Sequence, residues 1–120
     1  MNRRQALSGF AALSQDTRLS IVRLLVKAGP DGIGAGRIAD EVGVSASNLS
    51  FHLKELVHAG LVESARDARA IIYTANYDAL RGLIGFLMKD CCGGRPEICA
   101  PVLADPACCA PVKTRRRTNA

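Results

Sequence analysis

Thiols are the most reactive side chains in this 120-residue chain, and all five lie within residues 91–120. Cys91 and Cys92 are adjacent, and Cys99 follows seven residues after Cys92. Three thiolates without a histidine or carboxylate motif beside them favour a soft ion. A pyramidal three-coordinate ion such as As(III) or Sb(III) suits them better than tetrahedral zinc. The spacing therefore predicts a thiophilic site made of Cys91, Cys92 and Cys99.

The remaining thiols, Cys108 and Cys109, keep other chemistry open. One of them, or a solvent molecule, can supply the fourth ligand that Zn(II) or Cd(II) needs. The residues from Cys109 to Arg115 also have the C-x5-R spacing of a phosphate loop. Pro111 and the lack of a preceding strand make that match accidental. For Cys108 and Cys109 the sequence supports an auxiliary role and no role equally.

A second group of chemically useful residues is polar and gathers between positions 45 and 69. Small hydrogen-bonding side chains in the first two turns of a helix reach base edges and phosphates without bulk, and a lysine can bind a phosphate. Arginines at a hairpin tip can reach the backbone or the minor groove of adjacent DNA. The predicted DNA-binding residues are Ser45, Ser47, Asn48, Ser50, His52, Lys54, Arg66 and Arg69.

Apolar spacing predicts the elements that must position these residues. The first expected helix is residues 5–14, and a second runs from a cap at Asp16 or Thr17 to Gly29. A third helix is residues 35–42, with Gly43 as a left-handed stop. A fourth has Leu49, Leu53, Leu56 and Val57 on one face and ends at Gly60, and a fifth is capped by Asn76. Residues 61–66 and 70–74 are β-prone runs that predict a hairpin around Asp67, Ala68 and Arg69. In the fifth helix, Gly82 and Gly85 cost about 1 kcal/mol each against alanine, which suggests close approach of a packed partner.

Composition restricts the organisation and the cellular compartment. Four of the sixteen basic residues lie between Lys113 and Arg117, and without them twelve basic residues face eleven acidic ones. Net charge alone therefore does not indicate a nucleic-acid binder, and the basic run is more typical of a solvated tail. The expected domains are residues 1–90 and a Cys- and Pro-rich tail, residues 91–120. No apolar run is long enough for a membrane span or a signal peptide, which predicts a cytoplasmic protein without a membrane partner.

One long stretch carries a family resemblance. Residues 47–62 read S-x-x-S-x-H-L-x-x-L-x-x-A-G-L-V, with Asp16 to Leu19 upstream and Tyr73 downstream. Over roughly residues 5–90 the chain resembles the ArsR/SmtB family of metalloregulatory repressors. The resemblance implies a mostly α-helical, homodimeric winged helix-turn-helix with a β-hairpin wing, dimerised mainly through its first and last helices. It also implies binding of double-stranded operator DNA in the metal-free state and release when a metal or metalloid binds.

Two positions depart from the family pattern. The helix before the recognition helix, residues 36–42, lacks the cysteine motif that is frequent there. The usual wing-tip glycine is Ala68, which argues against a left-handed residue at the tip. The resemblance to arsenical-responsive members with a double cysteine and a third just past the last helix supports As(III) as the inducer.

The sequence therefore predicts a DNA-binding repressor, not an enzyme, which is released by As(III) or Sb(III) and needs no organic cofactor. The rivals within the fold are a thiol redox switch, in which oxidation joins two cysteines, and a Zn- or Cd-responsive repressor. A thiol enzyme or metalloid chaperone is a weaker rival, because no catalytic base or phosphate loop accompanies the thiols.

Overall fold

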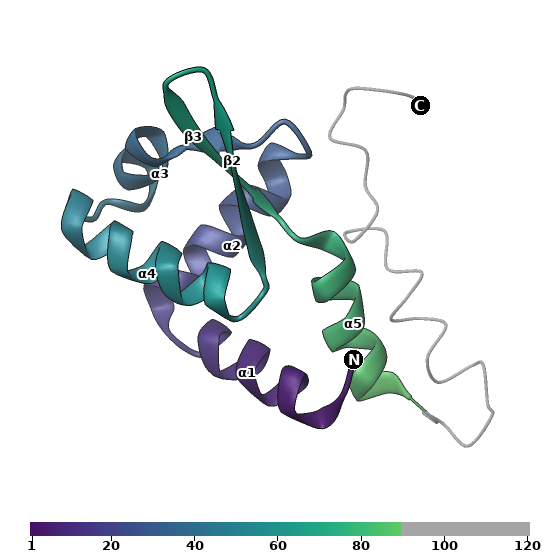
Figure 1. The fold of residues 1–120 in the computed structure, drawn as a ribbon. Helices are drawn as coiled ribbons and strands as arrows, with labels where there is room; N and C mark the ends of the chain where they lie inside the picture. The colour runs from purple at the N-terminus through teal and green to yellow at the C-terminus, as the bar shows by residue number, and fades with distance from the viewer. Residues whose placement is uncertain (90–120) are drawn as a thin grey trace. The chain divides into compact units, whose positions relative to one another are not determined.

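The computed structural model of the chain describes residues 1–89, shown in Figure 1. Within them the elements are α1 (Arg3–Leu13), α2 (Asp16–Ala28), β1 (Ile33–Gly34), α3 (Ala35–Val42), α4 (Ala46–His58), β2 (Val62–Asp67), β3 (Ala70–Ala75) and α5 (Tyr77–Met88). The chain divides into two units, Met1–Phe86 and Leu87–Ala120. The mostly helical fold with a β-hairpin wing is the predicted winged helix-turn-helix. No helix in the described part of the chain is long and apolar enough to cross a membrane.

The core of the first unit is aliphatic and joins the middle helices to the base of the wing. The largest fully buried side chains are Ile21, Leu25, Ile38, Leu49, Leu56, Leu61 and Val62. Three of the four apolar residues predicted to form one face of α4, Leu49, Leu53 and Leu56, lie in this core. The fourth, Val57, is 39% exposed, because it lies at the edge of that face. One face of α4 is thereby held against α2 and α3, and the opposite face is left for solvent or a ligand.

Helix ends follow local capping chemistry, with one correction. The Gln15 side chain, not Asp16 or Thr17, caps α2, and it accepts a hydrogen bond from the Arg18 N–H at 2.8 Å. Asp16 lies one position too late to cap, because its backbone is already helical and its carboxylate lies in the first turn. Gly43 ends α3 with φ +80°, so the left-handed stop predicted there is confirmed.

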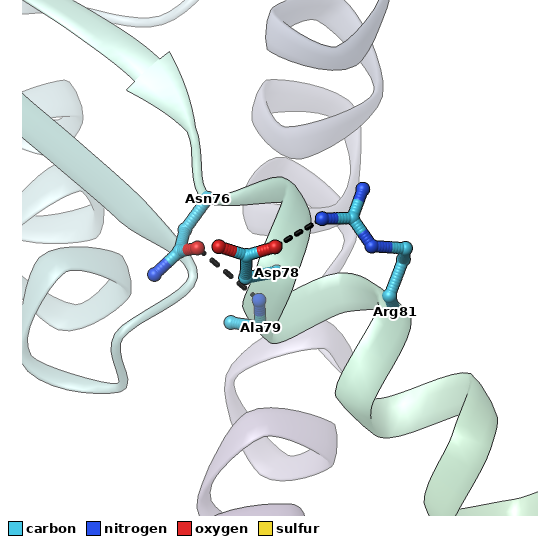
Figure 2. A network of polar contacts seen from close by, with 4 residues as sticks. All are labelled: Asn76, Asp78, Ala79 and Arg81. Atoms are coloured by element: carbon cyan, nitrogen blue, oxygen red, sulfur yellow. Dashed lines mark hydrogen bonds and ion pairs between the residues drawn. The ribbon is translucent and has the colours of Figure 1, made fainter.

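Asn76 caps α5 and also connects it to the end of α4. Its Oδ1 accepts from the Ala79 N–H at 3.1 Å, and its Nδ2 donates to the Gly60 carbonyl at 2.9 Å. Figure 2 shows the cap beside the ion pair between Asp78 and Arg81. The predicted cap is therefore confirmed, and one side chain fixes where the last helix leaves the sheet.

Close approach of α1 and α5 occurs at a glycine that the sequence analysis did not single out. A Cβ at Gly9 would lie 2.9 Å from Leu83 Cδ2, so the bare backbone of α1 accommodates this buried leucine. A Cβ at Gly82 would lie 3.1 Å from the Met1 side chain, and one at Gly85 would meet nothing within 4 Å in the described part of the chain. Nothing within residues 1–89 therefore packs closely on Gly85.

The sheet has a third strand that was not predicted. The strand order in the sheet is β1-β3-β2, and all neighbouring strands are antiparallel. Ile33 in β1 pairs with Tyr73 in β3. Two residues are too few for an alternating pattern, so β1 forms because β3 offers an open edge to the segment between α2 and α3. The predicted hairpin is confirmed, with its loop reduced to Ala68 and Arg69.

The expectation against a left-handed wing tip was wrong. Ala68 has φ +58°, and no other non-glycine residue described has a positive φ. Asp67 pairs with Ala70, so two residues close the hairpin, and such short loops need a positive φ to match the twist of the strands. The closure therefore forces Ala68 into the conformation that glycine adopts more easily.

Replacing Ala68 by glycine is expected to stabilise the domain by about 0.5 to 1 kcal/mol, because relief of the left-handed strain exceeds the extra entropy of the unfolded chain. Urea unfolding followed by circular dichroism measures the change. Ala65→Gly, in the extended part of β2, is the control and should lose about 0.5 to 1 kcal/mol. If Ala68→Gly and Ala65→Gly lower the free energy of unfolding equally, the backbone at Ala68 is not strained.

Candidate nucleic-acid interface

A helix-turn-helix is formed by α3, α4 and the short turn between them. The Gly43 and Val44 N–H groups both donate to the Ala39 carbonyl, at 2.8 and 3.2 Å, which closes α3 tightly. Ser45 then starts α4, and its Oγ accepts from the Asn48 N–H at 3.2 Å. The turn thus fixes the direction of α4 at its amino end, where side chains of a recognition helix approach base edges.

The predicted recognition residues of α4 are exposed, with one exception. Ser45, Ser47, Asn48, Ser50 and Lys54 are all on the surface of the helix. Ser45 also has a structural role as the cap, and its Oγ lies 3.5 Å from Ser47 Oγ. The structure therefore brings these five side chains to one helix end and its exposed flank, as DNA contact requires.

His52 is the exception, because it is half-buried and held by an arginine from α2. Arg18 donates from its terminal nitrogen to His52 Nδ1 at 3.2 Å and from Nε to the Ala12 carbonyl at 2.8 Å. A guanidinium can only donate, so Nδ1 accepts and the ring hydrogen of neutral His52 lies on Nε2. Arg18 consequently ties α4 to the end of α1, and Nε2 is the nitrogen left to donate to a ligand.

The wing carries the other predicted contacts. Arg66 lies in β2 and Arg69 in the hairpin loop, and both are exposed. Neither makes an ion pair within residues 1–89, where the recorded pair is Asp78 with Arg81. Two exposed guanidinium groups near the tip of the hairpin suit attraction to phosphate.

The predicted metal ligands Cys91, Cys92 and Cys99 lie outside the described residues, as do Cys108 and Cys109. Within residues 1–89, no group of three or more His, Asp or Glu side chains is placed to hold a metal ion.

Similarity to known proteins agrees with this geometry. Residues 13–65 match the family described as "Helix-turn-helix domain". The HTH-type transcriptional regulator YgaV of Escherichia coli K12 is 35% identical over 88 residues, which cover 73% of this chain and 87% of YgaV. An ArsR-like transcriptional regulator from Rhodococcus sp. RHA1 superposes with a TM-score of 0.63 at 28% identity, over 94% of this chain and 96% of that one.

The chain belongs to the ArsR/SmtB family. This ArsR/SmtB protein is a transcriptional regulator with a helix-turn-helix DNA-binding fold. The nodulation protein NolR of Rhizobium meliloti is also similar, at 38% identity over 81 residues that cover 67% of this chain and 64% of NolR.

This ArsR/SmtB regulator has an exposed aromatic residue on α4 that was not among the predicted DNA contacts. Phe51 is 56% exposed on the outer face of α4, between Ser47 and Lys54, and its ring meets that of His52 edge-on with centroids 5.3 Å apart. An exposed phenyl ring on a recognition helix can contact a thymine methyl group. The available signal was that position 51 falls outside the apolar spacing of Leu49, Leu53 and Leu56, which leaves it off the core face.

Proposed function

We propose that this chain is a homodimeric transcriptional repressor that binds operator DNA through α4 and the wing. It releases the DNA when As(III), or Sb(III), binds Cys91, Cys92 and Cys99. The observation that carries the DNA-binding part is the exposed polar face of α4 beside two wing arginines that make no ion pair within residues 1–89. In this proposal the chain has no enzymatic role and acts in the cytoplasm, where the operator is.

Exposed apolar side chains on the first and last helices support the dimer. Leu7 of α1 is 60% exposed and Ile84 of α5 is 51% exposed. The two helices meet where Gly9 packs on Leu83, so apolar surface from both is available to a second copy. A dimer would place two recognition helices about 34 to 36 Å apart, one turn of DNA, and read two half-sites.

Loss of single side chains from α4 is expected to weaken operator binding without unfolding the protein. Ser50→Ala should lower operator affinity about 5- to 10-fold through one lost contact. His52→Ala should lower it further, since it also releases Arg18. Fluorescence anisotropy with a duplex selected from a random pool by the wild type measures affinity, and circular dichroism checks folding. Unfolded variants or unchanged affinity would contradict this assignment of α4.

The wing arginines should act differently because phosphate contacts carry no sequence information. Arg66→Ala and Arg69→Ala are each expected to weaken binding to selected and random duplexes alike and to lower the slope of log affinity against log salt by about one. If affinity is lost for the selected duplex only, these arginines contact base edges and not phosphates.

Three considerations support As(III) as the inducer. Cys91 follows Met88, the last residue of α5, by three positions, so a site there adjoins one of the two proposed dimer helices. Three thiolates match the pyramidal coordination of As(III). Family membership supplies the regulatory role. A thiol redox switch, or a Zn(II) or Cd(II) response with a fourth ligand, remains the alternative within the same fold.

A further inference from the structure

A groove of about 410 Å³ lies between α4 and the wing, beside the recognition residues. Ser50, Lys54 and His58 line it from α4, and Ser64 and Tyr73 line it from β2 and β3. Ser64, Tyr73 and His58 were not among the predicted DNA contacts. The groove thus brings together three polar residues that were not predicted to contact DNA.

The two walls of the groove are built by regular structure. Residues 50, 54 and 58 are spaced by four and form one stripe about 12 Å long on α4. Ser64 and Tyr73 are directly paired across the hairpin, so their side chains leave the same face of the sheet. The positions of all five side chains therefore depend on helix and strand geometry, and not on a loop.

The polar part of the groove suits an anion, and Leu53 and Val57 complete its lining from α4. Its polar side chains are one ammonium, one imidazole and three hydroxyls, which can all donate hydrogen bonds. No carboxylate lines it among residues 1–89, and none of the five side chains is committed there to an ion pair. A second groove of about 470 Å³, by contrast, is lined by Glu63 and Asp78 together with Arg81.

We propose that the groove between α4 and the wing holds the sugar-phosphate backbone of one DNA strand, with the Ser64 and Tyr73 hydroxyls donating to a phosphodiester. The inference rests on the proposed DNA-binding function. A helix in the major groove and a wing in the adjacent minor groove are separated by a single backbone strand. That strand would pass between α4 and the hairpin of β2 and β3, which Figure 1 labels. The donors line the groove between these elements.

Removing one hydroxyl at a time tests the proposal with little risk of unfolding. Ser64→Ala and Tyr73→Phe are each expected to lower affinity about 5- to 20-fold, because each deletes a hydrogen bond to a charged group. The loss should be equal for the selected duplex and for a random one. Ser20→Ala, which removes an exposed hydroxyl from α2, is the matched control and should change nothing.

Duplexes with a single neutral methylphosphonate locate the phosphate. At the phosphate held in the groove, this replacement should weaken the wild type but weaken Tyr73→Phe little further, since the lost contact is the same. The groove proposal alone would be wrong if the wild type binds the selected duplex and neither Ser64→Ala nor Tyr73→Phe loses affinity while circular dichroism shows both variants folded. Failure of the wild type to select any duplex would overturn the proposed function.

A small anion is the other source of phosphate chemistry, and inorganic phosphate without DNA tests it. We expect inorganic phosphate to bind only in the millimolar range, as followed by NMR of the Tyr73 and Ser64 amides. Micromolar binding that Tyr73→Phe abolishes, with DNA affinity unchanged, would make the groove a small-anion site and overturn the backbone assignment.

Discussion

Replacing Gly32 by alanine is expected to destabilise the domain by about 2 to 5 kcal/mol, since it adds a left-handed strain of about 1 to 2 kcal/mol to an overpacking cost of about 1 to 3 kcal/mol. Gly32 has φ +71°, and a Cβ there would lie 2.5 Å from the Tyr73 carbonyl oxygen. Because that oxygen belongs to the backbone of β3, the central strand, it cannot move aside without breaking the sheet. In a domain whose whole stability is about 5 to 15 kcal/mol, such a loss leaves a large unfolded fraction.

Two other glycines distinguish the cost of backbone strain from the cost of a steric clash with the added Cβ. Gly43 has φ +80°, but a Cβ there would meet nothing within 4 Å among residues 1–89, so Gly43→Ala should lose only about 1 to 2 kcal/mol. Gly36 lies inside α3, and a Cβ there would likewise meet nothing within 4 Å in that part of the chain, so Gly36→Ala should gain about 0.5 to 1 kcal/mol. Urea unfolding measures all three variants. If Gly32→Ala loses no more than Gly43→Ala, β1 is not packed against β3 as described.

Replacing Cys91, Cys92 or Cys99 singly by serine is expected to abolish the response to arsenite while leaving operator affinity at the wild-type value. In the wild type, saturating arsenite should lower operator affinity about 5- to 150-fold, the range of a coupling of about 1 to 3 kcal/mol. Serine oxygen is a hard ligand that cannot replace a thiolate for a soft ion. By reciprocity, operator DNA should weaken arsenite binding by the same factor. Anisotropy of a labelled operator with fully reduced protein measures both directions.

The second cysteine pair provides the control. Cys108→Ser combined with Cys109→Ser should still respond to arsenite. Normal induction of the three single variants, together with loss in this double variant, would show that the wrong thiols were chosen. A reduced wild type that ignores arsenite but releases DNA with peroxide would favour the redox switch, and release by Zn(II) or Cd(II) alone would favour tetrahedral coordination.

The recognition helix could be predicted because its determinants are local. Leu49, Leu53 and Leu56 mark the buried face by spacing alone, and Gly43 and Ser45 mark the turn by their own conformational preferences. These preferences do not depend on distant residues, so the sequence alone predicted the helix-turn-helix, the hairpin and the Asn76 cap correctly. The thiol site likewise rests on the types and spacing of its residues, and it stays a prediction.

Contacts between segments far apart in the chain decided the rest. The hydrogen bond from Arg18 to His52 depends on how α2 and α4 pack, and the groove donors Ser64 and Tyr73 meet α4 only in the folded chain. The strand β1 exists because β3 offers it an edge, and the same pairing places Gly32 against a carbonyl oxygen. A two-residue hairpin loop imposes a positive φ on Ala68 against its intrinsic preference. Local sequence specifies helices and turns because their hydrogen bonds link near neighbours, whereas strand pairing and shared grooves join residues whose separation leaves no periodic pattern.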